Sequence, residues 1–150
     1  MGKIQAVCIS EKRGTQKKAL PQVRILENFG LEGDAHAGNW HRQVSLLSYE
    51  HVKEFEQKGI QVEAGAFGEN LLVSGIDFKM LPVGTKLRCQ NVLLEITQIG
   101  KECHSHCEIF HAIGDCIMPR EGVFARVLQG GIVKVGDVME IVSCSDFNSK

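Results

Sequence analysis

The sequence predicts a mainly β fold, a β-barrel with a few peripheral helices. Two observations carry this prediction: about seven or eight short strand-like runs follow one another, and only one segment has a confident helical pattern. Glycine turns lead into several of these runs, as is common in small barrels. No linker or low-complexity tract divides the 150 residues, so we expect a single domain over residues 1–150.

The expected strands of the N-terminal half are runs of apolar and β-branched residues over Ile4–Ile9, Gln22–Leu26 and Gln43–Leu47. Between the second and the third, residues 28–42 (NFGLEGDAHAGNWHR) contain three glycines and no helical period. This composition is too rich in glycine for a regular element and too specific for a spacer. We therefore expect an irregular, functional loop there.

One helix is expected, with Ser48 as its N-cap and an end near Lys58, where Gly59 follows. Its partial apolar face consists of Tyr49, Val52 and Phe55. A second glycine-rich turn, AGAFGEN at residues 64–70, precedes an apolar run over residues 71–73. Residues 81–100 then predict two strands joined by a two-residue turn, with three side chains facing one way, Val92, Leu94 and Ile96.

Composition excludes some classes of function. The net charge of -1 argues against a dedicated nucleic-acid-binding protein, which usually carries a strong basic excess. A local basic cluster is expected to be a solvated loop; it consists of Lys12, Arg13, Lys17 and Lys18. The start, MGKIQAVCIS, has no long apolar run, so we expect neither a signal peptide nor a membrane anchor, and a cytoplasmic protein.

The six cysteines are expected to be reduced thiols in that compartment, and Cys8 and Cys89 to be small core residues of strands. Half of the cysteines and half of the histidines gather in GKECHSHCEIFHAIGDCIMPREG, residues 100–122. The residues concerned are Cys103, His104, His106, Cys107, His111 and Cys116. Such side chains bind soft or borderline metals and carry sulfur chemistry.

Three interpretations of this segment stay open on the residues alone. C-x3-C-x3-H-x4-C supplies four potential ligands for tetrahedral zinc or an iron–sulfur cluster, although it departs from the usual C-x2-C spacing. Alternatively, one reactive thiol works beside histidines that lower its pKa or touch an anion. In the third interpretation the cysteines are packed and the histidines merely line the surface.

A second candidate site is GDAHAGNWHRQ. Asp34 and His36 flank one residue, so in an extended segment they project to the same side. Gly33 and Gly38 permit close approach of the backbone to a ligand, and Arg42 offers a forked donor for an oxyanion. The competing interpretation is a structural turn with an Asx hydrogen bond from Asp34 and a surface histidine.

A third candidate is MPREGVFARVLQGG, in which Arg120 and Arg126 could contact an anionic ligand. Arg126 lies in a strand-like run, where an arginine on the solvent face needs no function. Glu69 and Asn70, in FGEN, belong to the second glycine-rich turn, and Glu69 is open to the same two interpretations.

These segments together resemble a MOSC domain, the module shared with the C-terminal part of molybdenum cofactor sulfurases, and most closely its small stand-alone bacterial members. The matching stretches are GLEGDAHAG, HRQVSLLS, AGAFGENLLVSG, LPVGTKLRCQNVLLEITQIGKECHSHC and MPREGVFARVLQGGIVKVGDVMEIV. They occur in a consistent order from about residue 3 to residue 142. The resemblance implies a β-rich, barrel-like fold and an association with molybdenum cofactor.

The resemblance also implies a working cysteine, which ligates molybdenum in the cofactor-binding enzymes of the family or carries sulfur as a persulfide in the sulfurases. The matching position is Cys107, with Cys103 as the alternative. His104 and His106 would favour its thiolate. The pterin and its phosphate would be held by the segment that contains Asp34, His36, Gly38 and Arg42, together with Glu69, Asn70, Arg120 and Arg126.

Three functions follow as hypotheses: a protein that binds molybdenum cofactor (molybdopterin) or carries sulfur for it, an oxidoreductase acting on N-hydroxylated compounds, and a non-catalytic zinc-binding module. The expected partners are the cofactor or its biosynthesis and sulfuration proteins, not nucleic acid or a membrane. Pyridoxal phosphate is implied only through the parent sulfurases, and no lysine motif here supports it. The sequence predicts no particular oligomeric state.

Overall fold

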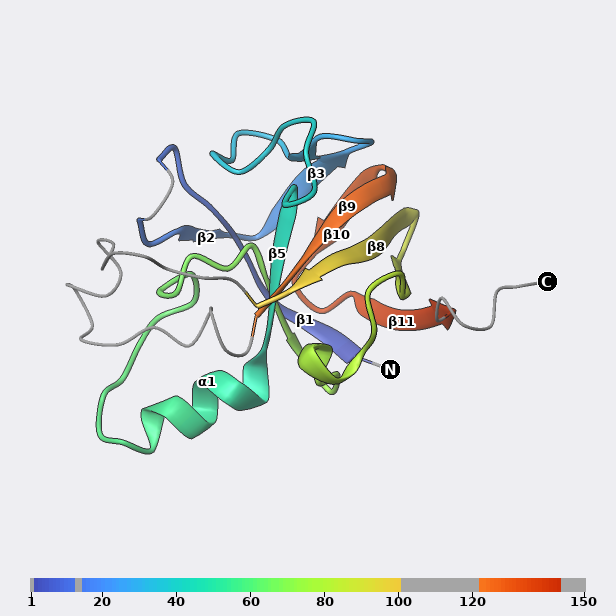
Figure 1. Ribbon diagram of the computed structural model, residues 1–150. Helices are drawn as coiled ribbons and strands as arrows, with labels where there is room; N and C mark the ends of the chain where they lie inside the picture. Colours follow the sequence, from blue (N-terminus) through green and yellow to red (C-terminus); the bar gives the residue numbers. More distant parts are fainter. Residues whose placement is uncertain (1, 13–14, 101–121, 144–150) are drawn as a thin grey trace.

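The computed structural model describes residues 2–12, 15–100 and 122–143 (Figure 1). Its elements are β1 (Gly2–Ile9), β2 (Lys18–Leu20), β3 (Gln22–Leu26), β4 (Gly30–Leu31), β5 (Val44–Ser48), α1 (Tyr49–Glu56), β6 (Leu71–Ser74), the 3-10 turn η1 (Phe78–Met80), β7 (Lys86–Cys89), β8 (Val92–Ile99), β9 (Val123–Gln129), β10 (Gly131–Lys134) and β11 (Val138–Ser143). The protein is mainly β, as the sequence predicts.

Seven strands close into a barrel in the order β11-β7-β8-β9-β5-β6-β1, because β1 also pairs with β11. The closing pair is antiparallel, with Gly2 opposite Met139. Strand β2 pairs with β1 outside this ring. Closure leaves the ring without an open edge, which explains how short strands form a stable sheet.

All neighbours within the ring are antiparallel except β5 and β6, which are parallel. Two parallel strands cannot be joined by a tight turn and need a crossover connection. Helix α1 and the glycine-rich turn after it provide that connection, since they lie between β5 and β6 in the chain. The crossover therefore places residues 64–70 at the start of β6.

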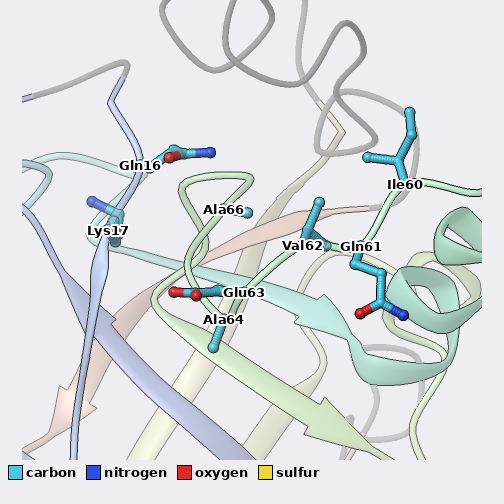
Figure 2. A pocket seen from close by; sticks show the side chains of 8 residues that line it. All are labelled: Gln16, Lys17, Ile60, Gln61, Val62, Glu63, Ala64 and Ala66. Carbon is cyan, nitrogen blue, oxygen red and sulfur yellow. The ribbon is translucent and has the colours of Figure 1, made fainter.

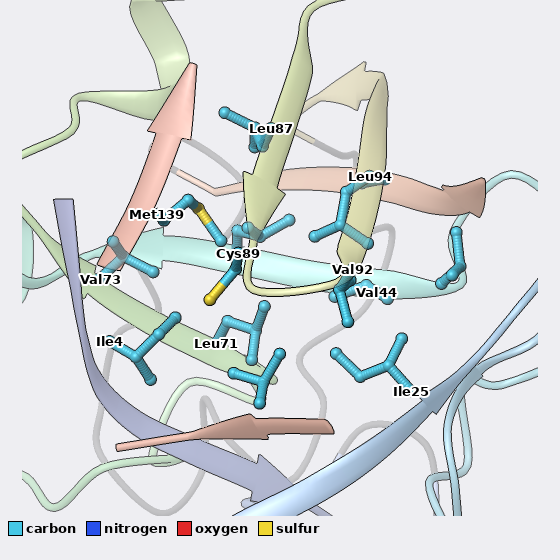
Figure 3. Close-up of a cluster of buried hydrophobic side chains, with 14 of the residues drawn as sticks. Ile4, Ile25, Val44, Leu71, Val73, Leu87, Cys89, Val92, Leu94 and Met139 are labelled. Carbon is cyan, nitrogen blue, oxygen red and sulfur yellow. The ribbon is translucent and has the colours of Figure 1, made fainter. Parts of the chain in front are cut away.

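The barrel interior is filled by apolar side chains that alternate along the strands, as Figure 3 shows for Leu71, Val73, Leu94 and Met139. A second sheet, in the order β10-β3-β4, packs against this core. It contributes four buried side chains, Val23, Ile25, Leu31 and Val133.

A smaller apolar cluster lies on the outer face of β1, β5, β6 and β9. Helix α1 covers this face with Val52 and Phe55, and the ring of Phe55 meets Phe67 edge-on at 5.1 Å between centroids. Because β5 has the barrel core on one face and this cluster on the other, all five of its residues are buried. The outer face is the side on which the candidate site is built.

Most local predictions are confirmed. The expected strands occur, Val92, Leu94 and Ile96 are all buried, and the turn between β7 and β8 consists of Gln90 and Asn91. Gln90 adopts a φ of 57°, which tight turns often require.

The predicted helix cap is confirmed in position only. Ser48 is the N-cap residue of α1, but its hydroxyl makes no capping hydrogen bond and instead donates to the carbonyl of Ile76. The helix ends at Glu56, two residues before the predicted end, and turns continue to Gly59. Within the described ranges, no helix is long and apolar enough to cross a membrane.

Candidate functional site

The site begins with a buried ion pair between Lys17 and Asp34. The Lys17 Nζ lies 2.7 Å from Asp34 Oδ1, and both side chains are 0% exposed. Nζ also donates to Ser10 Oγ at 3.0 Å and lies 3.2 Å from His36 Nδ1. Three chain segments, the one just after β1, the one just before β2 and the loop after β4, therefore meet at one ammonium group.

The Asp34 carboxylate is fully engaged in this cluster. Oδ1 also accepts the backbone N–H of Ser10 at 3.0 Å, and Oδ2 accepts that of His36 at 3.0 Å. The last bond is the Asx hydrogen bond of the structural interpretation, so that part of the prediction is confirmed. Asp34 and His36 also contact the same lysine, so the turn holds the histidine against a charged group.

The second glycine-rich turn packs against the same lysine. Buried Glu69 accepts the backbone N–H groups of Gly65 at 2.8 Å and Phe67 at 3.1 Å. The carbonyl of Gly65 in turn accepts the backbone N–H of Lys17 at 2.8 Å. The two glycine-rich segments, separate in the sequence, thus meet at Lys17. Glu69 stabilises the shape of its turn.

Asn70, the residue before β6, links the strands β1 and β5 of the barrel. Its Oδ1 accepts the backbone N–H of Ser45 at 2.9 Å, and its Nδ2 donates to the carbonyl of Cys8 at 3.1 Å. The Asn70 side chain is therefore occupied by β1 and β5, and it is completely buried. Its contacts give it a structural role beneath the loops.

From His36 the cluster continues through an aromatic ring to Arg42. The Trp40 indole lies parallel to the His36 ring, with 6.5 Å between centroids and 6° between planes, and its Nε1 donates to the His36 carbonyl at 2.8 Å. The Arg42 guanidinium carbon lies 5.7 Å from the Trp40 centroid and 5.3 Å from that of Phe124. Two aromatic faces thus hold the cation through favourable cation–π contacts.

Arg42 leads on to the ends of the cysteine-rich segment. Its Nε donates to Gln98 Oε1 at 3.2 Å, and Gln98 Nε2 donates to the Gly100 carbonyl at 2.8 Å. The N–H of Gly100 donates to the carbonyl of Gly122 at 2.7 Å. The two residues that flank the cysteine-rich segment are therefore in contact, and a single glutamine separates them from Arg42.

Several candidates lie outside the described residues: Cys103, His104, His106, Cys107, His111, Cys116 and Arg120. Of the others, Gly38 lies between His36 and Trp40, and its N–H donates to the Phe29 carbonyl at 2.7 Å. Arg126 forms an exposed ion pair with Glu95 on β8, 3.1 Å between Nη2 and Oε1. Within residues 2–12, 15–100 and 122–143, no group of three potential His, Cys, Asp or Glu ligands could hold a metal ion.

The two described cysteines are core residues, as predicted. Cys8 is 0% and Cys89 1% exposed. Burial is the main cause that raises the pKa of each thiol to about 12, and neighbouring carboxylates, Glu69 for Cys8 and Asp137 for Cys89, add to it. Neither thiol is suited to form a thiolate near neutral pH.

The prediction of a solvated basic loop is wrong for Lys17, which is the centre of the site. Lys12 and Lys18 are exposed as expected, whereas Lys17 is buried by Asp34 and the turn at residues 63–66. Sequence reasoning also missed Ser10, Trp40 and Gln98. Of these three, Trp40 alone carried a signal, because it is the single tryptophan of the chain and lies between the candidate residues Gly38 and Arg42.

A pocket of about 360 Å³ adjoins this cluster (Figure 2). Gln16 and Lys17 form one side, and residues 60–64 together with Ala66 form the other. The lining mixes amides and a carboxylate with apolar side chains such as Ile60 and Val62. Such a mixture suits a ligand with both polar and apolar groups.

Gly65 permits the contact between the glycine-rich turn and Lys17. A Cβ atom at Gly65 would lie 2.2 Å from the Lys17 carbonyl oxygen, and the residue has a φ of 87°. Gly65→Ala should therefore lower the free energy of unfolding by clearly more than the roughly 1–2 kcal/mol expected for a left-handed conformation alone. Gly59→Ala is the matched control, because φ is 98° there and nothing lies within 4 Å. Equal losses in urea unfolding would contradict this account.

The buried carboxyl of Glu69 should make a contribution to the free energy of unfolding that depends on pH. Burial raises the pKa of its carboxyl from 4.5 to about 6, against the opposing effects of the backbone N–H donors and Lys17. The folded state therefore holds this proton more tightly than the unfolded chain, so the contribution is present below pH 4.5 and is lost as the pH rises through 6.

Relative to Glu69→Gln, the wild type should lose about 2 kcal/mol of unfolding free energy over that pH range. Chemical unfolding at several pH values measures this difference. Glu63→Gln, which removes an exposed carboxyl nearby, is the control. A constant difference between wild type and Glu69→Gln would refute the assignment.

The fold occurs in several solved structures. The YuaD protein of Bacillus subtilis aligns with a TM-score of 0.77 and 21% identity, covering 93% of this chain and 94% of that one. YiiM from Geobacillus stearothermophilus aligns with a TM-score of 0.73 and 20% identity, over 95% and 76% of the two chains. At these identities the likeness establishes the fold.

Sequence comparison gives the family. The uncharacterized protein YflK of Bacillus subtilis (strain 168) is 24% identical over 157 residues, covering 95% of this chain and 71% of that protein. The MOSC domain family matches residues 33–140, which is most of the chain; of the site described above, Ser10 and Lys17 precede the matched range. The chain therefore belongs to the MOSC domain family, which is associated with molybdenum-cofactor-related proteins.

Proposed function

We propose that this protein binds molybdenum cofactor, or carries sulfur for it, through a reactive cysteine in the segment between Gly100 and Gly122. Cys107 is the proposed thiol and Cys103 its alternative. The observation that carries the proposal is the continuous series of contacts from Lys17 to Gly100. It joins both glycine-rich segments to the point where the cysteine-rich segment leaves and rejoins the barrel.

Arg42 fits the phosphate of such a cofactor. Its Nε is held by Gln98 and its flat faces by Trp40 and Phe124. In the part of the chain that the structure describes, no hydrogen bond occupies its two Nη groups. An arginine oriented in this way loses little freedom when it binds an oxyanion with both Nη groups. The arginines Arg120 and Arg126 are proposed to add positive charge.

The properties of the two described thiols support a reactive cysteine in the segment between Gly100 and Gly122. Because Cys8 and Cys89 are buried with raised pKa values, a reactive cysteine must come from the remaining four, three of which lie in the cysteine-rich segment. A thiolate there could ligate molybdenum or accept sulfane sulfur. When bound, the cofactor would supply the molybdenum centre and its redox chemistry, while the protein supplies the thiolate, the phosphate donors and the walls of the pocket.

Replacing the working cysteine should remove the bound group without unfolding the protein. Anaerobically purified wild type should carry molybdenum, pterin or a persulfide, and Cys107→Ala should lose it. Cys144→Ala, outside the segment, is the matched control and should retain it. Elemental analysis, pterin fluorescence after oxidation and persulfide labelling measure the three groups.

Each outcome of this experiment decides between specific alternatives. Loss in Cys103→Ala and not in Cys107→Ala would move the assignment to Cys103. Retention of every group in both variants would contradict the proposal of a working thiol in this segment. Stoichiometric zinc that disappears with these cysteines would replace the proposal by a zinc-binding module.

Arg42→Gln should weaken cofactor binding by about tenfold or more, because a charge-assisted hydrogen bond contributes roughly 1.5–3 kcal/mol. Arg24→Gln is the control, since Arg24 is exposed on β3 in the separate sheet. Titration of both variants with extracted cofactor, followed by pterin fluorescence, gives the two affinities. Equal affinities would show that Arg42 does not contact the anion.

A further inference from the structure

We propose that Lys17 is a positioning residue for His36. The Lys17 ammonium donates a hydrogen bond to His36 Nδ1, so the ring carries its own proton on Nε2. From Nε2 the ring donates a hydrogen bond to an oxygen of the ligand. The hydrogen bond from His36 to a ligand rests on the proposed cofactor-binding function. The tautomer of His36 does not rest on it.

The first step is a count of donors and acceptors at Lys17. An ammonium group has three N–H donors and no acceptor. Three acceptors surround Nζ, namely Asp34 Oδ1 at 2.7 Å, Ser10 Oγ at 3.0 Å and His36 Nδ1 at 3.2 Å. Each donor therefore has one acceptor, and the Lys17 side chain is 0% exposed, so water does not compete.

The directions of the neighbouring hydrogen bonds agree with this count. The single proton of the Ser10 hydroxyl is donated to the Lys12 carbonyl at 2.9 Å, so its oxygen accepts from Lys17. Asp34 receives its hydrogen bonds from N–H donors: the backbone of Ser10, the backbone of His36 and the ammonium itself. His36 Nδ1 is consequently an acceptor and carries no proton.

The usual alternative for a histidine beside an aspartate is an Nδ1–H donated to the carboxylate. Here the distance from His36 Nδ1 to Asp34 Oδ2 is 3.8 Å, too long for a hydrogen bond, whereas the ammonium is 0.6 Å nearer, at 3.2 Å. Lys17 has taken the position that the carboxylate would otherwise fill. The lysine thus decides the tautomer, not the aspartate.

This tautomer restricts what His36 can recognise. With Nδ1 occupied and Nε2 protonated, the neutral ring offers no lone pair for a metal ion and cannot accept a proton as a base without losing its bond to Lys17. It can donate to an oxygen of a phosphate or of a carbonyl group. The parallel Trp40 ring and the bond from Trp40 Nε1 to the His36 carbonyl hold it in this orientation.

The tautomer can be measured directly in wild-type protein labelled with 15N at histidine. Long-range 1H–15N correlation spectra should show His36 Nδ1 as unprotonated and Nε2 as protonated. In Lys17→Met the Nδ1–H form should appear, because Asp34 then attracts that proton. Lys18→Met, which removes the adjacent exposed lysine, should keep the wild-type pattern.

An Nδ1–H tautomer in wild type would overturn the proposal, and so would an unchanged pattern in a folded Lys17→Met. Should Lys17→Met not fold, wild type provides the test through Lys17 itself. Its ammonium should give a slowly exchanging 15N signal with a nuclear Overhauser contact to Hε1 of His36. A rapidly exchanging Nζ without that contact would refute the arrangement.

The donor role is tested by two amide substitutions. The amide nitrogen of Gln can approach the place of His36 Nε2, whereas that of Asn approaches Nδ1. His36→Gln should therefore retain more pterin than His36→Asn, and equal loss would contradict the donor role. A wild type that has the predicted tautomer but carries neither pterin nor molybdenum would refute the proposed function alone.

Discussion

The buried ion pair of Lys17 and Asp34 is the interaction on which the site depends. Removing two charges from water is costly, and their attraction offsets this only when further hydrogen bonds satisfy both groups. Here Asp34 accepts two backbone N–H groups, and Lys17 donates to Ser10 and His36. Loss of either partner would leave an uncompensated charge in the protein. The pair therefore specifies one arrangement of the loops around it.

The barrel provides a rigid base for those loops. Strand β5 is buried on both faces, and Asn70 connects it to β1 through side-chain hydrogen bonds. Helix α1 covers the outer cluster next to the loops. Packing on both sides explains how loops so rich in glycine keep a defined geometry. The polar groups of the site are thus held from beneath by apolar contacts and from the side by one another.

Local features of the fold could be predicted because their causes are local. The alternation of Val92, Leu94 and Ile96 places them in the core, and the Asx hydrogen bond of Asp34 involves residues two apart. The position of Ser48 as the N-cap of α1 was predicted as well, but the partner of its hydroxyl was not, because that partner is the carbonyl of Ile76, 28 residues away. Arg126 was predicted in part. Its strand could be identified from the local sequence, whereas its ion-pair partner Glu95 lies on the neighbouring strand and could not.

The sequence by itself determined the class of fold, the strands, the buried cysteines and the two glycine-rich segments in which the site lies, because these follow from composition and periodicity. Only the tertiary structure decided that Lys17 joins those segments and that a glutamine links Arg42 to Gly100. Lys12, Lys17 and Lys18 are the same residue type in one polar stretch, and burial alone distinguishes them. Whether a side chain is buried depends on what packs around it. Around Lys17 these are the loop that contains Asp34 and the turn that contains Gly65, both distant from it in the sequence.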